Sequence, residues 1–437
     1  MIFFVRIKSM SAIKSIFSCY FKFNLLIKIL VGLVLGAIVG LIFQNNTGMI
    51  EFLTPFGDLF IRLLKMIMVP VIACTLIVGA STITPSHLGR IGGKLVLFYM
   101  ITSVFAIIIG LAVGMIFQPG AGLELAAVEG KARAAQSPSI TTILLNIVPT
   151  NPMNSLSEGQ VLPIIFFCLL FGIALAFGRD SEDESVRKSS DAVFYFIDGV
   201  SHAMFKIVRW VMQYAPFGVF ALIFIVFSKN GATAFGPLAT VSASVYIGLI
   251  LQVVIVYFGV CLVMRLSPWK FLVKVRHPMV TAFVTRSSGA TLPVSIDAAE
   301  RMGVPKSVYG FGLPVGSTIN MDGTTIYLGV CAIFIANAVG VPLDFSQQVT
   351  IVLTAVLASI GTAGVPGAGA IMLLMVLESV GLKVEAGSAV AVAYGMILGI
   401  DALLDMGRTS MNVVGDMSGV VAIAKSENEL DMDKWNS

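Results

Sequence analysis

The sequence predicts an all-α polytopic membrane protein, and three of its features support that fold class. Of the 437 residues, 57% are hydrophobic and only 12% are charged, whereas soluble proteins carry about 25% charged residues. Mean hydropathy is +0.95, and several apolar runs reach the roughly 18 residues that a membrane-spanning helix needs. Two shorter apolar pairs near the C-terminal end turn back around polar tips. These features predict eight transmembrane helices plus two re-entrant helical hairpins.

The first half of the chain is ordinary apolar helix with basic connections. The first six helices are predicted near residues 24–43, 56–81, 94–117, 161–177, 192–227 and 238–264. The stretch 118–150 is rich in glycine and proline and includes EGKAR, which indicates an exposed outer loop. Lysine and arginine cluster before the first helix and in alternate connections, which predicts a cytoplasmic N-terminus. The basic, apolar segment 1–23 is predicted to be an interfacial helix.

Two segments in the second half predict re-entrant hairpins. In residues 278–302, the limbs MVTAFV and VSIDAAERM flank the tip TRSSGATLP, and residues 347–382 repeat the pattern around GTAGVPGAG. Neither limb of the first segment is long enough to cross about 30 Å of hydrocarbon at about 1.5 Å per residue. The first turn is therefore expected at Ser287, Ser288, Gly289 and Pro293. Between the hairpins, TINMDGT interrupts an apolar helix, and an unwound turn there would free carbonyls to bind a cation.

The last apolar segment, 388–424, carries a polar stripe within the sequence DALLDMGRTSMNVVGD. At about 100° per residue, six polar side chains share an arc of roughly 100°. They are Asp401, Asp405, Arg408, Thr409, Asn412 and Asp416. Because each charge at membrane depth costs about 2.5–3.5 kcal/mol, the stripe needs partners and a wet interior. Two hairpins, each followed by a helix with a polar middle, indicate the inverted repeats of a secondary transporter.

Four segments resemble the signature motifs of the dicarboxylate/amino acid:cation symporters, the glutamate transporter family. They are TRSSGATLP, STINMDGTTIYL, ASIGTAGVPGAG and DALLDMGRTSMNVVGD. The resemblance covers essentially the whole chain and is strongest to sodium-coupled prokaryotic aspartate and glutamate symporters. It implies a homotrimer whose protomers have a scaffold domain and a mobile transport domain. The implied scaffold comprises 24–93 and 118–236 with the outer loop, the transport domain comprises 94–117 and 237–425, and 426–437 is a polar cytoplasmic tail.

The resemblance also implies substrate and cation ligands. The implied substrate contacts are Arg286, Ser288, Thr324, Val365, Gly369, Asp405, Arg408, Thr409 and Asn412. Arg408 offers a forked donor to a side-chain carboxylate, Asp405 suits an ammonium group, and Asn412 suits an α-carboxylate. The first implied sodium site uses Asp416 with carbonyls of Gly316, Asn320 and Asn412, and the second uses carbonyls of Thr318, Ser359, Ile360 and Thr362. The third uses Asp322, the Asn320 side chain, Thr102, Ser103 and the Tyr99 carbonyl.

One departure and two simpler interpretations accompany these assignments. The first tip reads SSGA where close relatives carry a third serine, so Gly289 removes a hydroxyl and could alter specificity. Asp405 and Arg408, spaced i and i+3, could be a structural ion pair. Asp322 could cap a kink. An intramembrane aspartyl protease would pair Asp322 with Asp405, but Arg408 would keep one carboxylate charged. A channel would explain polar helices but not closed glycine-rich tips.

The expected function is import of aspartate or glutamate with sodium by an elevator movement, with the second hairpin as the outer gate. The expected partners are the acidic amino acid, co-transported sodium ions and membrane lipid, with no other cofactor, no nucleic acid and no enzymatic activity. The expected location is the inner cell membrane, with both termini cytoplasmic. The alternative is a proton-coupled or mixed symporter of the same fold that carries C4-dicarboxylates or neutral amino acids.

Overall fold

The computed structural model describes residues 24–81, 90–123, 125, 141, 145–360, 367–385 and 387–437. Across these ranges the regular elements are all helices, and seven helical stretches are long and apolar enough to cross a membrane. One stretch, Glu184–Val263, runs through 80 residues and contains two of the eight predicted helices. The prediction of an all-α multi-pass membrane protein is confirmed. The predicted interfacial segment 1–23 and most of the predicted outer loop lie outside the described residues.

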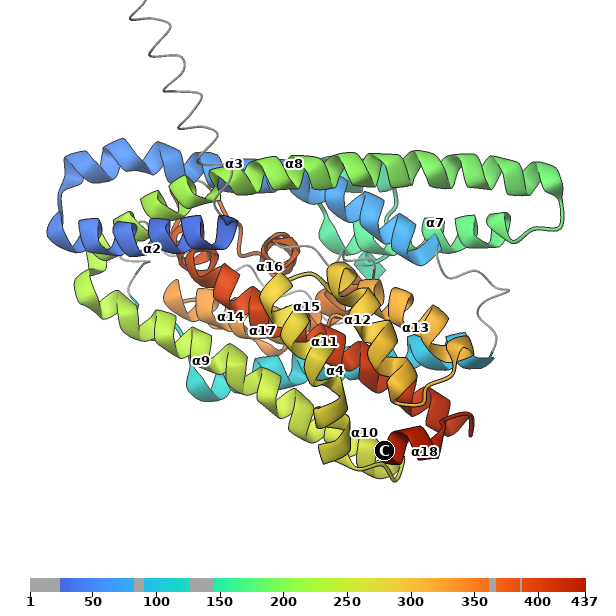
Figure 1. Cartoon of the computed structure of the whole chain (residues 1–437). Helices are drawn as coiled ribbons and strands as arrows, with labels where there is room; N and C mark the ends of the chain where they lie inside the picture. Colours follow the sequence, from blue (N-terminus) through green and yellow to red (C-terminus); the bar gives the residue numbers. More distant parts are fainter. Residues whose placement is uncertain are drawn as a thin grey trace, which may run out of the picture.

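Four helices pack on one another along one side of the molecule. They are α2 (Leu25–Ile42), α3 (Thr47–Ser81), α7 (Val161–Arg179) and α8 (Glu184–Asn230), with α3 and α8 side by side at the top of Figure 1. Glycines at every fourth position let α2 approach α8 closely, because a Cβ at Gly36 would lie 2.7 Å from the Phe220 carbonyl oxygen. The short helix α6 (Pro152–Glu158) precedes α7.

A 3-10 turn, η2 (Gly231–Ala234), joins α8 to the sixth predicted helix. That helix consists of α9 (Phe235–Leu251), one π-helical turn, η3 (Gln252–Tyr257), and α10 (Phe258–Val263). It lies against α4 (Arg90–Phe117). The second group of helices consists of α4, α9, η3, α10 and the helices that follow residue 267. This group occupies the lower part of Figure 1 and holds all the predicted site residues that the structure describes.

The first hairpin is formed by α11 (Pro268–Thr285) and α12 (Ser288–Arg301). The predicted first limb began ten residues too late, because Pro278 lies inside α11 rather than at its start. The predicted turn was also too long: Arg286 and Ser287 alone separate the helices. Arg286 adopts a left-handed conformation (φ 53°), and the Ser287 side chain caps α12 through the Ala290 amide, so Ser288, Gly289 and Pro293 already belong to the helix.

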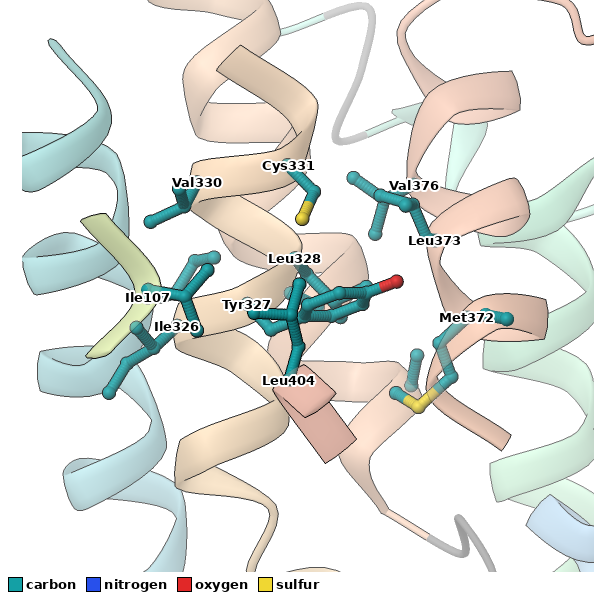
Figure 2. Packing of buried hydrophobic residues seen from close by; sticks show 14 of the residues in the cluster. Ile107, Ile326, Tyr327, Leu328, Val330, Cys331, Met372, Leu373, Val376 and Leu404 are labelled. Carbon is teal, nitrogen blue, oxygen red and sulfur yellow. The ribbon is translucent and has the colours of Figure 1, made fainter. Parts of the chain in front are cut away.

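The interrupted helix and the second hairpin follow. The interrupted helix comprises α13 (Lys306–Ile319) and α14 (Asp322–Ala338), and the hairpin comprises α15 (Phe345–Ser359) and α16 (Ala368–Ser379). The predicted break at TINMDGT is present, since Asn320 and Met321 separate the two half-helices. Every residue of α14 except Asn337 is buried. Figure 2 shows α14 between α4 and α16, with Ile326 facing Ile107 and Cys331 facing Val376.

The polar stripe lies on α17 (Ala389–Ser426), which runs diagonally through the second group. Beyond it the chain folds back into α18 (Met432–Asn436), where Trp435 is 1% exposed and the Asp431 amide donates to the Gly303 carbonyl at 2.9 Å. The polar composition of 426–437 did not indicate this docking. At the end of α17, hydrogen bonds from Lys94 and then Arg90 lower the pKa of the Glu427 carboxyl and join α17 to the start of α4.

Candidate functional site

The break between α13 and α14 carries a first cluster of oxygen and amide groups. The Asn320 side chain is fully buried, and its Nδ2 donates to the Asn412 carbonyl at 3.1 Å and to Asp416 Oδ1 at 3.0 Å. Gly316 lies against the same carboxylate, because a Cβ there would be 2.6 Å from Asp416 Oδ1. The four residues of the first implied cation site therefore meet at one point. A break in a buried helix frees carbonyls that can coordinate a cation.

A second cluster forms around Asp322, the first residue of α14. Its Oδ1 accepts hydrogen bonds from the Ser103 hydroxyl at 2.8 Å and the Thr102 hydroxyl at 3.3 Å, both on α4. Thr102 Oγ1 also lies 3.1 Å from the Tyr99 carbonyl oxygen and 3.5 Å from Asn320 Oδ1. All five residues of the third implied cation site are thus adjacent. Among the described residues the Asp322 carboxylate accepts its hydrogen bonds from α4 and from Gln252 and Tyr257, so capping of α14 does not account for its position.

For the remaining implied cation site, the structure describes three of its four residues, Thr318, Ser359 and Ile360. Thr318 donates to the Val315 carbonyl at 3.0 Å and Ser359 donates to the Val356 carbonyl at 2.6 Å, each within its own helix. Ile360 ends α15, and Thr362 lies outside the described residues. Among the described residues of this set no hydrogen bond joins α13 to α15. Its assignment stays a prediction.

Three charged groups of the α17 stripe form a buried ion cluster. Arg408 is 1% exposed and donates from Nη1 and Nη2 to the two oxygens of Asp401, at 2.8 and 3.3 Å. Its Nε donates to Asp405 Oδ1 at 3.0 Å, and its guanidinium lies 4.4 Å from the centre of the Tyr327 ring. Thr409 donates to Asp405 Oδ1 at 3.2 Å. The i, i+3 pair considered as structural is formed, but Asp401 is a second and stronger partner.

Three helices begin beside this stripe. From the tip before α12, Arg286 Nη1 lies 4.0 Å from Asp405 Oδ2. In the first turn of α14, the Gly323 amide donates to Asn412 Oδ1 at 2.8 Å. In the first turn of α16, Gly369 lies directly against the Arg408 guanidinium, and a Cβ there would overlap it. Helix N-termini carry partial positive charge and favour anions. Their convergence on the polar stripe, with α16 directly at the Arg408 guanidinium, makes the region suited to a carboxylate.

The implied substrate residues otherwise divide into three groups. Asn412 Nδ2 donates to the Thr324 hydroxyl at 3.2 Å, so these two side chains are adjacent. Two buried oxygens near the stripe and the first tip, Asp405 Oδ2 and Ser288 Oγ, have no hydrogen-bond partner among the described residues. Buried polar atoms without partners cost free energy and call for a ligand, ion or water. Val365 lies outside the described residues.

Three residues that complete these clusters were not assigned to a site from sequence. Asp401 was recognised only as a member of the polar stripe, although its i, i+7 spacing from Arg408 places it on the same helix face. Gln252 and Tyr257 donate to Asp322 Oδ2 at 3.0 and 2.8 Å. A glutamine inside the apolar run of the sixth helix was the one available signal, since buried glutamine is uncommon.

The fold and its clusters define a class before any relative is considered. Re-entrant hairpins, a helix broken inside the protein and buried charges beside the break are features of secondary transporters. The aspartyl pair of a protease is not formed, because Asp322 binds groups on α4 and the π turn whereas Asp405 binds Arg408.

Residues 25–426 match the family model described as the Sodium:dicarboxylate symporter family. The chain belongs to this family, and it is a transporter rather than an enzyme.

Similar proteins span almost the whole chain. A proton/sodium-glutamate symport protein of Bacillus caldotenax is 35% identical over 422 residues, which cover 94% of this chain and 97% of that protein. The proton/glutamate-aspartate symporter of Escherichia coli strain K12 is 36% identical over 429 residues, covering 94% and 95%. A C4-dicarboxylate transport protein of Bacillus subtilis strain 168 is 33% identical over 418 residues, covering 94% and 95%. The relatives thus include carriers of amino acids and carriers of simple dicarboxylates.

Proposed function

We propose that this symporter imports aspartate or glutamate together with sodium. The observation that carries the proposal is the pairing of unlike groups on one buried helix face. Arg408 presents a guanidinium, and one turn away Asp405 Oδ2 presents a buried negative oxygen that accepts no hydrogen bond from the described residues and has Arg286 Nη1 at 4.0 Å. An acidic amino acid has a side-chain carboxylate for the first and an ammonium group for the second. A C4-dicarboxylate has no cation to offer Asp405, and a neutral amino acid has no second carboxylate for Arg408.

Sodium is favoured as the coupling ion by the oxygen-rich surroundings of Asp322. The hydroxyls of Thr102 and Ser103 lie 3.3 and 2.8 Å from Asp322 Oδ1, and the Thr102 hydroxyl also lies 3.1 Å from a backbone carbonyl oxygen and 3.5 Å from an amide oxygen. A proton needs one carboxylate oxygen, whereas a metal cation needs several oxygen ligands arranged around it. The other cluster adds a further carboxylate, that of Asp416, beside the break between α13 and α14. Proton or mixed coupling is the competing hypothesis, since the Bacillus caldotenax relative is named for protons and sodium and the Escherichia coli relative for protons.

The remaining parts of the proposal follow the family resemblance. They are a homotrimer in the inner cell membrane, cytoplasmic termini, and an elevator movement of the second helix group with the second hairpin as gate. Within the described ranges, few direct polar contacts join the two groups. Lys65 of α3 and Glu378 of α16 form an ion pair at 2.9 Å, and the Gly387 amide donates to Asp58 of α3 at 3.2 Å. Such a contact surface is compatible with sliding.

Uptake into liposomes containing the purified protein tests the proposal. Labelled aspartate, glutamate and succinate are offered under an inward sodium gradient, under a proton gradient in sodium-free buffer, and under both. The expected result is saturable uptake of the amino acids only with sodium, and little succinate uptake. Asp405→Asn is expected to reduce the uptake of aspartate and glutamate far more than the uptake of succinate. Equal uptake in sodium-free buffer would refute sodium as the coupling ion. Faster uptake of succinate than of the amino acids would refute acidic amino acids as the substrate class.

A further inference from the structure

The sixth predicted helix contains one turn that is not α-helical, η3 (Gln252–Tyr257). In a π turn the hydrogen bonds join residues five apart, so such residues return to the same side of the helix. In an α-helix they would point about 140° apart. Gln252 and Tyr257, which begin and end this turn, are both fully buried, and both reach Asp322. The π geometry therefore brings two donors from one helix to one carboxylate.

The two carboxylate oxygens of Asp322 accept hydrogen bonds from different helices. Tyr257 Oη donates to Oδ2 at 2.8 Å, and Gln252 Nε2 donates to the same oxygen at 3.0 Å. Gln252 Nε2 also lies 3.3 Å from the Thr102 carbonyl oxygen. Oδ1 is turned toward the hydroxyls of Thr102 and Ser103. The carboxylate is thus held at one oxygen by the π turn, and its other oxygen is directed at the candidate cation site.

Placing Gln252 and Tyr257 at Asp322 costs free energy that an all-apolar helix would avoid. Gln252 Oε1 is buried and has no hydrogen-bond partner in the part of the chain that the structure describes, so folding loses the hydration of one acceptor without replacing it. Rotating the amide would place Oε1 against the Asp322 oxygen, so the carboxylate fixes its orientation. Gly415 of α17 leaves room for the tyrosine, because a Cβ there would lie 2.6 Å from Tyr257 Oη. Isolated π turns occur frequently at functional sites.

We propose that Gln252 and Tyr257 are positioning residues for the coupling cation. They hold Asp322 Oδ2 so that Oδ1 stays directed at Thr102, Ser103 and Asn320, and they do not contact the ion themselves. This inference rests on the proposed function, because it requires a cation at this cluster. Partners that orient a ligating side chain typically change ion affinity by about 10- to 100-fold when they are removed.

The test is a sodium titration of the purified full chain. Tyr257→Phe removes one donor without changing side-chain shape, and Gln252→Leu removes the other. Aspartate affinity is measured by calorimetry at increasing sodium. Each variant is expected to shift the half-maximal sodium concentration upward by about tenfold or more, while aspartate affinity at saturating sodium stays within about twofold of the parent. Tyr246→Phe is the matched control, since this tyrosine of α9 donates to the Leu403 carbonyl at 2.8 Å.

The outcomes separate the two levels of the argument. A parent protein whose affinity for aspartate ignores sodium overturns the proposed coupling and this inference with it. If the parent depends on sodium but Tyr257→Phe and Gln252→Leu keep its half-maximal sodium concentration, only the positioning role of these two residues is refuted. A lower melting temperature without a sodium shift also overturns it, because that result describes a structural role. If one variant fails to fold, the other decides, because each leaves the second donor in place.

Discussion

Replacing Arg408 with cysteine tests the charge arrangement of the α17 stripe directly. In the parent, the guanidinium donates three hydrogen bonds to two buried carboxylates, Asp401 and Asp405. Without it, the sole described cation beside them is Arg286, whose Nη1 is 4.0 Å from Asp405 Oδ2. Breaking a buried ion pair from one side costs about 3–5 kcal/mol. We therefore expect the variant to have a lower melting temperature than the parent.

The effect on the substrate is a separate quantity. A substrate carboxylate would lose its guanidinium partner, and truncating one side of a buried charged pair costs about 2–5 kcal/mol. At about 1.4 kcal/mol per factor of ten, aspartate affinity is expected to fall by about 30-fold to several-thousand-fold. Calorimetric titration with aspartate at saturating sodium measures this change, and liposome uptake follows it. Neutral amino acids are expected to compete better in the variant than in the parent.

Two further variants separate binding from folding. Asp401→Asn combined with Arg408→Cys removes one of the stranded anions, so thermal stability is expected to recover in part while acidic uptake stays absent. Arg301→Cys makes the same change at an exposed i, i+4 pair with Asp297, where the pair contributes only about 0.3–0.5 kcal/mol. Parent-like aspartate affinity in folded Arg408→Cys would refute the role given to this residue.

Four other substitutions test separate parts of the structure. Asp416→Asn or Asp322→Asn is expected to raise the half-maximal sodium concentration for uptake by more than about tenfold, since a cation site loses a charged oxygen ligand; unchanged sodium dependence in both would remove them from cation sites. Lys65→Gln breaks the partly exposed ion pair between α3 and α16, which contributes up to about 1 kcal/mol, so uptake rate is expected to change less than about fivefold; a large change in aspartate affinity would contradict a contact-surface role. Gly323→Ala adds a Cβ that overlaps the α17 backbone, and overpacking of about 1–3 kcal/mol is expected to lower the melting temperature; a parent-like melting curve would show that the helices can separate.

Hydropathy predicted the helices well, because apolar length is a local property. It placed the limits of the first hairpin poorly, since Pro278 was interpreted as a boundary and instead lies within α11. The break at Asn320 and Met321 was predicted correctly from composition, because asparagine, aspartate and glycine are weak helix formers. The docking of α18 was not predicted, since one buried tryptophan in a polar segment gives no periodic signal.

The parts of the site that lie within one helix could be predicted from the sequence pattern, whereas contacts between distant segments could not. The α17 stripe follows from helical periodicity, and all six of its side chains are buried. The meeting of Thr102 and Ser103 with Asp322 joins residues about 220 positions apart, and it came from family resemblance rather than from spacing. Gln252 was missed because a π turn breaks the 3.6-residue period on which the pattern depends.

One planar amide, that of Asn320, spans both buried carboxylate clusters. Its nitrogen faces Asp416 at 3.0 Å, while its oxygen lies 3.5 Å from the Thr102 hydroxyl that also reaches Asp322. The two ends of an amide cannot be turned independently, so an ion that reorients one end changes the surroundings of the other. Such coupling is reciprocal by thermodynamic linkage. Occupancy of one cluster by an ion would then change the affinity of the other cluster, and the Asn320 amide is the group that links the two.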